Sequence, residues 1–413
     1  MKVKTLIAIP LIFVFIVLHF KNPEQELHKQ SVSTEAKVSG AFESLAQWND
    51  QRAYPQKNIP TSGYYAAFEY SRKNLNKGGV DSEVEPWKSI GPHNIGGRTL
   101  AIAFNPQNPN TIYAGSASGG LWRSASGGVG INAWEHISTG LPVLAVSTIS
   151  IASNDANTIY IGTGEVYNYQ NTGTGFTIRP TRGSYGIGIL KTVDGGRTWT
   201  KSLDWTSNQE RGVWAVRIDP QNPNTVWAGT TEGVFKSIDA GQNWQQVNST
   251  IMIMDLAINP ADPNTVFVSA GNLFSEGLGV YRTQDGGGTW DKMQGLPSSF
   301  GGKAMLAISP SSPNIVFASI GHSTSSNGAT WLVKSEDNSD TWSTVSRQDY
   351  SRWQGWFAHD VAVHPDQPGT VITIGIDIWK STTGGANLSL KSTRDWRLGE
   401  RTPIGGQDGR SPT

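Results

Sequence analysis

Thr192-Val-Asp-Gly-Gly-Arg-Thr-Trp199 is the segment that decides the fold, because near copies of it recur along the 413-residue chain. Two further copies are clean, and a worn one has serine in place of the second glycine. Two more are degraded: one reaches its tryptophan only after an insertion, and the other lacks the aspartate. The six copies begin at Ser124, Thr192, Ser237, Thr283, Ser335 and Ser381.

Each residue type in this segment suits a tight turn between strands. The aspartate can accept backbone N–H bonds inside the turn, and the glycine adopts a backbone conformation that strains other residues. The tryptophan offers a large aromatic surface for packing between sheets. Three clean copies at a period of about 45 residues indicate a repeat architecture. The residues expected to have these structural roles are Asp194, Trp199, Asp239, Trp244, Asp285, Trp290, Asp337 and Trp342.

A second repeated phrase precedes each turn, and it reads as an apolar strand, an Asn/Pro-rich turn and another apolar strand. The first copy runs from Leu100 through Asn105-Pro106 to Gly115. A third strand then leads into the turn segment and a fourth follows it. Six repeats of four strands predict an all-β fold, a β-propeller, whereas a β-sandwich does not repeat one phrase six times. The later copies are Ile149–Ile161, Val213–Gly229, Met254–Ser269, Met305–Ser319 and Val361–Gly375.

The sequence leaves two ways of closing the ring. Trp87–Ile90 precedes the first inner strand and reads as an orphan outer strand, which would complete the sixth blade. Alternatively, the six visible repeats belong to a truncated ring of seven or more blades that continues beyond Thr413. In both alternatives the predicted propeller covers residues 87–413.

The amino-acid composition argues against several classes of function. The formal net charge is zero, with 33 basic and 33 acidic residues, so we expect no nucleic-acid partner. The chain has no cysteine, which excludes disulfides, thiolate metal sites and cysteine nucleophiles. The spacing of the acidic residues shows no oxygen cage for calcium. We therefore expect neither a metal nor a cofactor.

The first residues predict export to the periplasm, the cell surface or the medium. Lys2 and Lys4 precede the apolar run Leu6–Leu18, which is short for a transmembrane helix and suits a signal-peptide core. No small-residue cleavage site follows, so residues 1–21 are a signal peptide or an uncleaved anchor, the one expected link to a membrane. Residues 22–86 read as a partly helical linker.

Function is expected on the face that carries the longer loops. Propeller topology places the first-to-second and third-to-fourth turns on one face, and the more variable loops on the other. Aromatic rings there can stack on sugar faces, while carboxylates bind hydroxyls or transfer protons; the alternative is that the glutamates are merely solvated and the tryptophans pack the blades. The predicted binding residues are Arg98, Glu165, Tyr167, Tyr169, Trp205, His322, Trp353 and Trp356, and the catalytic candidates are Glu165, Glu232, Glu276 and Asp360.

The repeated turn resembles the Asp-box, or BNR repeat, of sialidases, of sortilin-type (VPS10) receptors and of xyloglucan-degrading glycoside hydrolases. Trp87–Arg98 and Tyr113–Arg123 also resemble the opening of exported bacterial BNR-repeat proteins, labelled sortilin-like or glycosyl hydrolase. The resemblance implies a propeller from about Trp87 to the end of the chain. The cysteine-rich modules of sortilin receptors are absent, and Ile178-Arg179-Pro180 does not match the Arg-Ile-Pro motif of sialidases.

The likeness to xyloglucanases can be followed residue by residue. Their first blade carries Tyr-Ala-Arg-Thr-Asp-Ile-Gly-Gly, in which the aspartate is catalytic, and their second catalytic aspartate lies in a second propeller. This chain matches the motif at Tyr113, Ala114, Gly119 and Gly120, but Ala117 stands at the place of the aspartate. A standard glycoside hydrolase needs two carboxyl groups, so the substitution counts against catalysis.

The sequence therefore favours an exported, non-catalytic binding module for a polysaccharide or a cell-surface protein ligand. The alternative is a glycoside hydrolase that acts on polysaccharide through Glu165 and a second carboxylate from Glu232, Glu276 or Asp360. A third class is an assembly factor that docks a protein partner.

Overall fold

The computed structural model divides into two compact units, Met1–Glu69 and Tyr70–Thr413. Helix α4 (Thr61–Asn74) lies at the boundary in the sequence, and no described helix is long and apolar enough to cross a membrane. The structure describes residues 47, 50–51, 54–55, 61–74, 97–130, 132–143, 145–167, 186–206, 211–273, 275–297, 301–322, 330–395 and 400–402.

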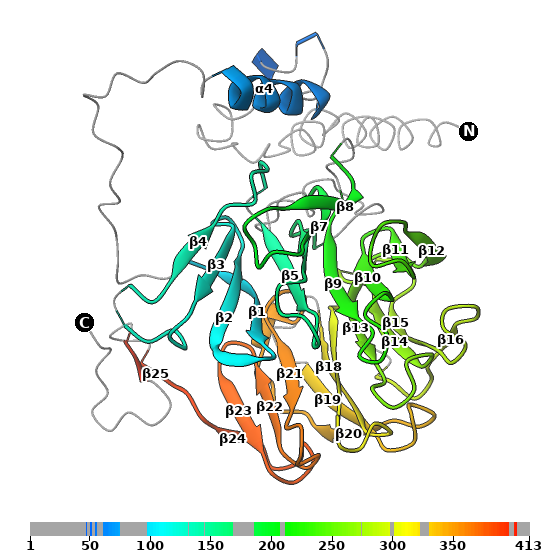
Figure 1. Cartoon of the computed structure of the whole chain (residues 1–413). Coiled ribbons are helices and arrows are strands. Elements are labelled where there is room, and N and C mark those ends of the chain that lie inside the picture. Colours follow the sequence, from blue (N-terminus) through cyan, green and yellow to red (C-terminus); the bar gives the residue numbers. More distant parts are fainter. Residues whose placement is uncertain are drawn as a thin grey trace, which may run out of the picture. The chain divides into compact units, whose positions relative to one another are not determined.

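The second unit is a propeller of six four-stranded antiparallel sheets, each with its strands in sequence order (Figure 1). This confirms the predicted fold class. Blade 1 contains β1 (Thr99–Asn105), β2 (Asn108–Ser116), β3 (Leu121–Ser124) and β4 (Glu135–Ile137). Blade 2 contains β5 (Val146–Ile151), β6 (Ile159–Thr163), β7 (Gly188–Thr192) and β8 (Thr200–Asp204). Blade 3 contains β9 (Val213–Ile218), β10 (Val226–Thr230), β11 (Gly233–Ser237) and β12 (Gln245–Asn248).

The remaining blades repeat the pattern. Blade 4 contains β13 (Ile253–Ile258), β14 (Val266–Ala270), β15 (Gly279–Thr283) and β16 (Asp291–Lys292). Blade 5 contains β17 (Ala304–Ile308), β18 (Val316–Gly321), β19 (Thr330–Ser335) and β20 (Ser343–Ser346). Blade 6 contains β21 (Asp360–Val363), β22 (Val371–Ile374), β23 (Ile378–Ser381) and β24 (Ser389–Leu390), and a hairpin of β25 (Thr393–Asp395) and β26 (Glu400–Thr402) follows.

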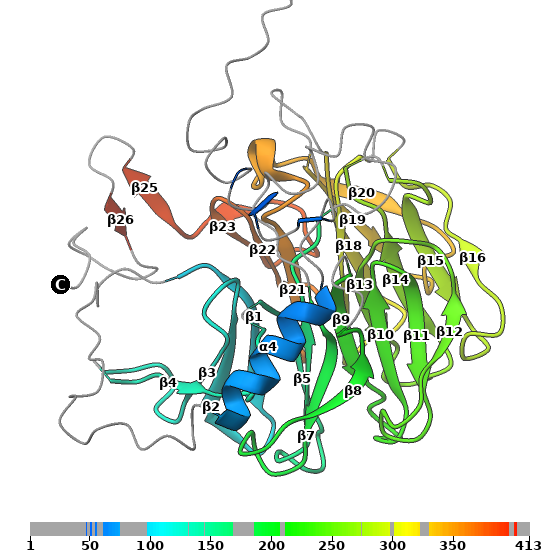
Figure 2. The ribbon, with the colours of Figure 1, turned by 90° about the horizontal axis from the view of Figure 1, so that it is seen from above.

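Burial explains why the second strand of a blade reads as a continuous apolar run. Every residue of β6, β10, β14 and β18 is buried, because a neighbouring blade covers each side of the sheet. Such a strand shows no alternation of polar and apolar residues. The fourth strands lie at the rim and are exposed or half-buried, as in β8 and β12. Figure 2 shows the sheets side by side from above.

The two kinds of short turn lie on one face, as the topology predicts. In blade 2 the backbone N–H of Gly195, in the turn between β7 and β8, donates to the carbonyl of Asn157, between β5 and β6, at 3.0 Å. Asp194 Oδ1 accepts the backbone N–H groups of Arg197 and Thr198, both at 2.9 Å. Gly196 has φ +95°, a left-handed conformation in which a side chain is strained.

Tryptophans of the repeated turn reach the preceding blade. The indole N–H of Trp290, in blade 4, donates to the carbonyl of Val247 on β12 at 3.1 Å. That of Trp244, in blade 3, donates to the hydroxyl of Ser202 on β8 at 3.1 Å. These contacts join consecutive blades near the rim. The predicted closing strand Trp87–Ile90, the predicted leader 1–21 and most of the predicted linker 22–86 lie outside the described residues.

Replacing Trp227 by alanine should destabilise the propeller by about 3–5 kcal/mol, the usual cost of truncating a buried aromatic side chain. Trp227 on β10 is fully buried and packs edge-on to Trp290, with ring centroids 6.3 Å apart. Urea unfolding followed by circular dichroism measures the change. Ile238→Ala is the matched control, because Ile238 is exposed and its loss should change stability by less than about 0.5 kcal/mol. Equal effects of the two variants would contradict this packing.

Candidate functional site

A cavity of about 530 Å³ lies in the channel at the centre of the ring. All six blades line it, because its wall is built from residues on or beside their inner strands. One such residue from each blade, in chain order, is Leu100, Ser147, Trp214, Met254, Met305 and Asp360. The inner strands therefore bring together side chains that are far apart in the sequence.

Glu165 follows β6 and is completely buried. Its two carboxylate oxygens accept hydrogen bonds from the guanidinium group of Arg98, with Nη2 and Oε2 2.8 Å apart. The hydroxyl of Tyr167 also donates to Oε1. A buried carboxylate is costly unless it is paired and hydrogen-bonded. Glu165 therefore fixes Arg98 and Tyr167, both of which line the cavity.

Three aromatic rings pack against Tyr167, beside this charged group. The ring of Tyr167 lies 5.1 Å from that of Trp214, 5.3 Å from that of Trp356 and 5.1 Å from that of Phe357, between centroids. The guanidinium carbon of Arg98 lies 5.4 Å from the centroid of the Phe357 ring, close enough for a cation–π interaction. The site thus combines flat apolar surfaces with a fixed cation.

Asn272 ties the loops that carry these aromatics. Its buried side-chain amide donates to the carbonyl of Tyr167 at 3.0 Å and to that of Trp356 at 2.8 Å. Tyr167 belongs to a loop of blade 2, while Trp356 lies in the connection from blade 5 to blade 6. Asn272, which follows blade 4's second strand, therefore fixes two loops that are far apart in the sequence.

Asp360, the first residue of β21, lines the cavity with an unusual carboxyl group. Burial raises its pKa to about 6; nearby Asp255 raises it further, while Lys303 acts in the opposite direction. The backbone N–H of Val361 donates to its Oδ1 at 2.8 Å. A carboxyl group with this pKa is protonated for a substantial fraction of the time near pH 6, so it can donate a proton.

Lys303 and Asp255 are the charged neighbours of Asp360. Lys303 is buried, which lowers the pKa of its ammonium group, and it also lines the cavity. Asp255 is buried on β13 and accepts from Arg217 Nη2 at 3.0 Å and from the backbone N–H of Leu306 at 2.9 Å. Both oxygens of Asp255 are therefore occupied, and its role is to hold the strands and tune Asp360.

His359 precedes Asp360 and is held rigidly in the neutral form. Its Nε2 lies 2.9 Å from the carbonyl of Gly355, which can only accept, so Nε2 carries the proton. Nδ1 then accepts from the hydroxyl of Ser319 at 2.8 Å, which lies 2.7 Å from the hydroxyl of Tyr350. Burial, with help from Lys303, lowers the pKa of His359 to about 3. This histidine fixes the chain before Asp360 and does not exchange protons near neutral pH.

The structure thus brings Arg98, Glu165, Tyr167, Trp356 and Asp360 together. Arg98, Tyr167 and Asp360 line the cavity, and Glu165 and Trp356 contact Tyr167. The other described candidates are not among the lining residues. Glu232 forms an ion pair with Arg211, whose Nε lies 3.3 Å from Oε1 of Glu232. The guanidinium carbon of Arg211 also lies 5.4 Å from the centroid of the Trp205 ring. These three residues form a separate cluster between blades 2 and 3. Glu276 is exposed on a loop, and His322 is half-buried after β18. Tyr169 and the side chain of Trp353 lie outside the described part of the chain.

Sequence reasoning missed Trp214 and Asp255 on inner strands, Lys303 just before β17, and Asn272 just after β14. A signal for one of them was present: Asp255 interrupts the apolar stretch Ile253–Ile258. A charged residue in such a strand must face either the channel or a partner. Among the described residues, no three His, Asp or Glu side chains are grouped so that they could hold a metal ion.

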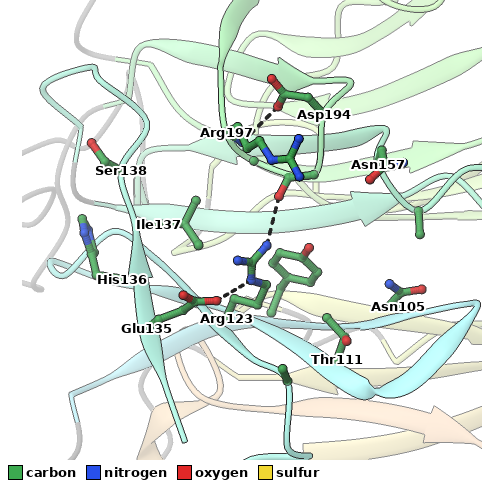
Figure 3. Close-up of a pocket in the computed structure, with 15 residues that line it drawn as sticks. Asn105, Thr111, Arg123, Glu135, His136, Ile137, Ser138, Asn157, Asp194 and Arg197 are labelled. Carbon is green, nitrogen blue, oxygen red and sulfur yellow. Dashed lines mark hydrogen bonds and ion pairs between the residues drawn. The ribbon is translucent and has the colours of Figure 1, made fainter. Parts of the chain in front are cut away.

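A second cavity, of about 570 Å³, lies between blades 1 and 2 on the face of the short turns (Figure 3). Arg123 on β3 crosses it. Its Nε donates to Glu135 at 2.7 Å and its Nη1 to the carbonyl of Gly195 at 3.3 Å. This cavity separates two blades and contains none of the predicted binding residues.

Comparison with known proteins finds similarity to xyloglucanases. No protein-family model matches the chain. A xyloglucanase of Acetivibrio thermocellus is 23% identical over 370 residues, which are 77% of this chain and 41% of that protein. A xyloglucanase of a Paenibacillus species is 22% identical over 367 residues, 77% of this chain and 33% of that protein. The chain thus spans less than half the length of these relatives.

Two solved structures of GH74 enzymes share the propeller fold. A GH74 enzyme of Niastella koreensis superposes with a TM-score of 0.53 at 18% identity, over 72% of this chain and 45% of that one. An ancestral GH74 enzyme gives 0.54 at 17% identity, over 74% of this chain and 39% of that one.

These relatives correct the function favoured by the sequence. The interpretation as a non-catalytic binding module is wrong, because the similar curated proteins are xyloglucanases and support the glycoside hydrolase alternative. The sequence argument relied on Ala117 at the place of a catalytic aspartate. In the structure the backbone N–H of Ala117 donates to the carbonyl of Arg98 at 3.0 Å. The motif position therefore lies beside the backbone of Arg98, whereas the carboxyl group of Asp360 lies in the central cavity.

Removing the guanidinium group with Arg98→Met should destabilise the protein by about 3–5 kcal/mol, because Glu165 would stay buried without its cation. The double variant Arg98→Met/Glu165→Gln should recover most of that loss. Chemical unfolding at pH 7 gives both values. Lys201→Met, which breaks a pair with Asp204 that is more exposed, should cost less than about 1 kcal/mol. A double variant no more stable than Arg98→Met would contradict the account of Glu165.

Proposed function

We propose that this propeller is part of a glycoside hydrolase that cleaves a polysaccharide of the xyloglucan class, with Asp360 as the proton donor. The observation that carries the proposal is a carboxyl group with a pKa raised to about 6 in the central cavity. The similarity to xyloglucanases over 77% of the chain supports the choice of substrate class.

The walls of the cavity suit a sugar chain. Trp214 and Phe357 line it and offer apolar faces for sugar rings. Arg98 and Tyr167 are held by Glu165 and can bind sugar hydroxyls without first being ordered. Because these groups are fixed before the substrate arrives, less conformational entropy is lost on binding.

Asp360 would protonate the oxygen of the glycosidic bond as that bond breaks. A general acid works best when its pKa lies near the working pH, and burial gives Asp360 such a pKa. Glu165 acts through Arg98 and Tyr167 and has no oxygen left for the reaction. Hydrolysis needs a second carboxylate. In the xyloglucanases that the first blade resembles, the two catalytic groups come from two propellers, so the proposal assigns one of the two groups to this propeller.

Replacing Asp360 by asparagine should lower sugar release from xyloglucan by about 100-fold or more, the usual contribution of general acid catalysis. Activity of the unaltered protein should fall above about pH 6, where the carboxyl group loses its proton. Reducing-sugar assays on the unaltered protein and on the Asp360→Asn variant, both at natural length, measure the two effects.

An aryl glycoside with a dinitrophenolate leaving group sharpens this test. Such a group departs without protonation, so Asp360→Asn should retain most of its activity on that substrate. Glu276→Gln is the matched control and should leave both activities unchanged, because Glu276 is exposed and outside the cavity. Equal losses on the two substrates would exclude Asp360 as the acid. No release from xyloglucan by the unaltered protein would overturn the proposed function itself.

A further inference from the structure

Lys303 is a buried cation that lacks a partner of its own. The residue is only 8% exposed, and its side chain lines the central cavity. Among the described residues, its ammonium group has neither a hydrogen-bond partner nor an ion-pair partner. Burying an unpaired charge is costly. A ligand that brings a negative charge into the cavity would remove this cost.

Backbone hydrogen bonds fix the position from which this side chain starts. The N–H of Lys303 donates to the carbonyl of Gly355 at 3.2 Å, and its own carbonyl accepts from the N–H of Gly321 at 2.9 Å. The carbonyl of Gly355 also accepts from Nε2 of His359 at 2.9 Å. Gly321 must lack a side chain, because a Cβ there would lie 2.1 Å from the same carbonyl. Lys303 is therefore held beside the start of β21.

Two of the acidic groups that act on Lys303 are already paired with other cations. Burial lowers the pKa of Lys303, and the negative charges of Asp255 and Glu165 act in the opposite direction. Glu165, however, is bonded to the guanidinium group of Arg98. Asp255 is bonded to that of Arg217. Each of these pairs is neutral as a whole, so neither supplies a charge that is free to balance the ammonium group.

Asp360 is the third acidic group that acts on Lys303. Burial, with help from Asp255, raises its pKa to about 6, so below pH 6 it is mostly neutral. His359, the other titratable neighbour, is also neutral there, because its pKa lies at about 3. Below pH 6 the cavity therefore holds one positive charge that no described side chain balances.

The rest of the cavity wall suits a sugar ring. Trp214 and Phe357 line it with aromatic faces, on which the apolar face of a sugar can lie. Arg98 and Tyr167 add polar groups that are already held in place. The volume of about 530 Å³ is typical of a site for a small organic ligand. The matching ligand has both a sugar ring and a single negative charge.

We propose that the central cavity binds a uronic acid unit of an acidic glycan, with the carboxylate of the sugar on the ammonium group of Lys303. A uronic acid carries a carboxylate in place of the hydroxymethyl group of a neutral sugar. One carboxylate balances one ammonium group, whereas a phosphate monoester brings nearly two negative charges. Binding breaks no bond, so this proposal goes beyond the proposed hydrolysis and does not depend on it.

Two glycosides that differ only at this group test the proposal. Methyl β-glucuronide and methyl β-glucoside are titrated into the protein at natural length at pH 5, and calorimetry measures their affinities. We expect the glucuronide to bind about 10-fold more tightly or better, because it adds a charge-assisted hydrogen bond. Equal affinities, or no binding of the glucuronide, would overturn the proposal. Acetate should bind more weakly than the glucuronide; equal binding would mean that the cavity recognises a carboxylate without its sugar.

Variants of Lys303 assign the preference to one side chain. Lys303→Met removes a buried charge, so it should keep the melting temperature of the unaltered protein and lose the preference for the glucuronide. Lys303→Arg keeps the charge and should keep most of the preference. Lys201→Met is the matched control and should keep all of it, because Lys201 lies on β8 and outside the cavity. A preference that survives in Lys303→Met would overturn the proposal.

The pH dependence of binding needs no substitution. From pH 8 to pH 5, the affinity for the glucuronide should rise by about 10-fold or more, since Asp360 gains a proton and no longer competes for Lys303. The affinity for the glucoside should not change. A constant affinity for the glucuronide would contradict this account of the charges. Sugar release is not measured here, so failure of this binding site and failure of the proposed hydrolysis are distinguishable.

Discussion

The structure depends on the contact between one blade and the next. A basic side chain from the third strand donates to the carbonyl of a left-handed residue in the following turn, above an aromatic ring that the following blade buries. The aromatic contributes apolar burial, which has no direction, and the hydrogen bond fixes the register between sheets. Repetition of this contact sets the angle between blades and so forms the central channel.

The central channel that this packing forms determines the pKa of Asp360. Asp360 lies half-buried among the inner strands, and the loss of part of its hydration favours its neutral form. Asp255 is held by Arg217 and adds a negative charge, while Lys303 keeps the shift moderate. The pKa of the proposed acid is therefore a property of the whole ring, since these residues come from different blades.

Sequence predicted the fold well and the site in part. The repeated turn at Asp194 and its copies depend on local rules, so their spacing revealed six four-stranded blades. Glu165, Tyr167 and Asp360 were found because loops and strand starts flank the channel. Trp214 was missed, since nothing in the local sequence says which side of an inner strand faces the channel. The preference for a binding module came from Ala117 at the place of one catalytic aspartate and from the position of the second aspartate in another propeller, and the similarity to xyloglucanases outweighed it.

The central claim is that burial in the channel raises the pKa of the Asp360 carboxyl group to about 6. A carbon-13 NMR titration of the side-chain carboxyl of Asp360, assigned by comparison with the Asp360→Asn protein, measures this directly. The account predicts a midpoint near pH 6, about two units above an ordinary aspartate. A midpoint near pH 4 would show that Asp360 is solvated, and it would remove the chemical basis of the proposed reaction.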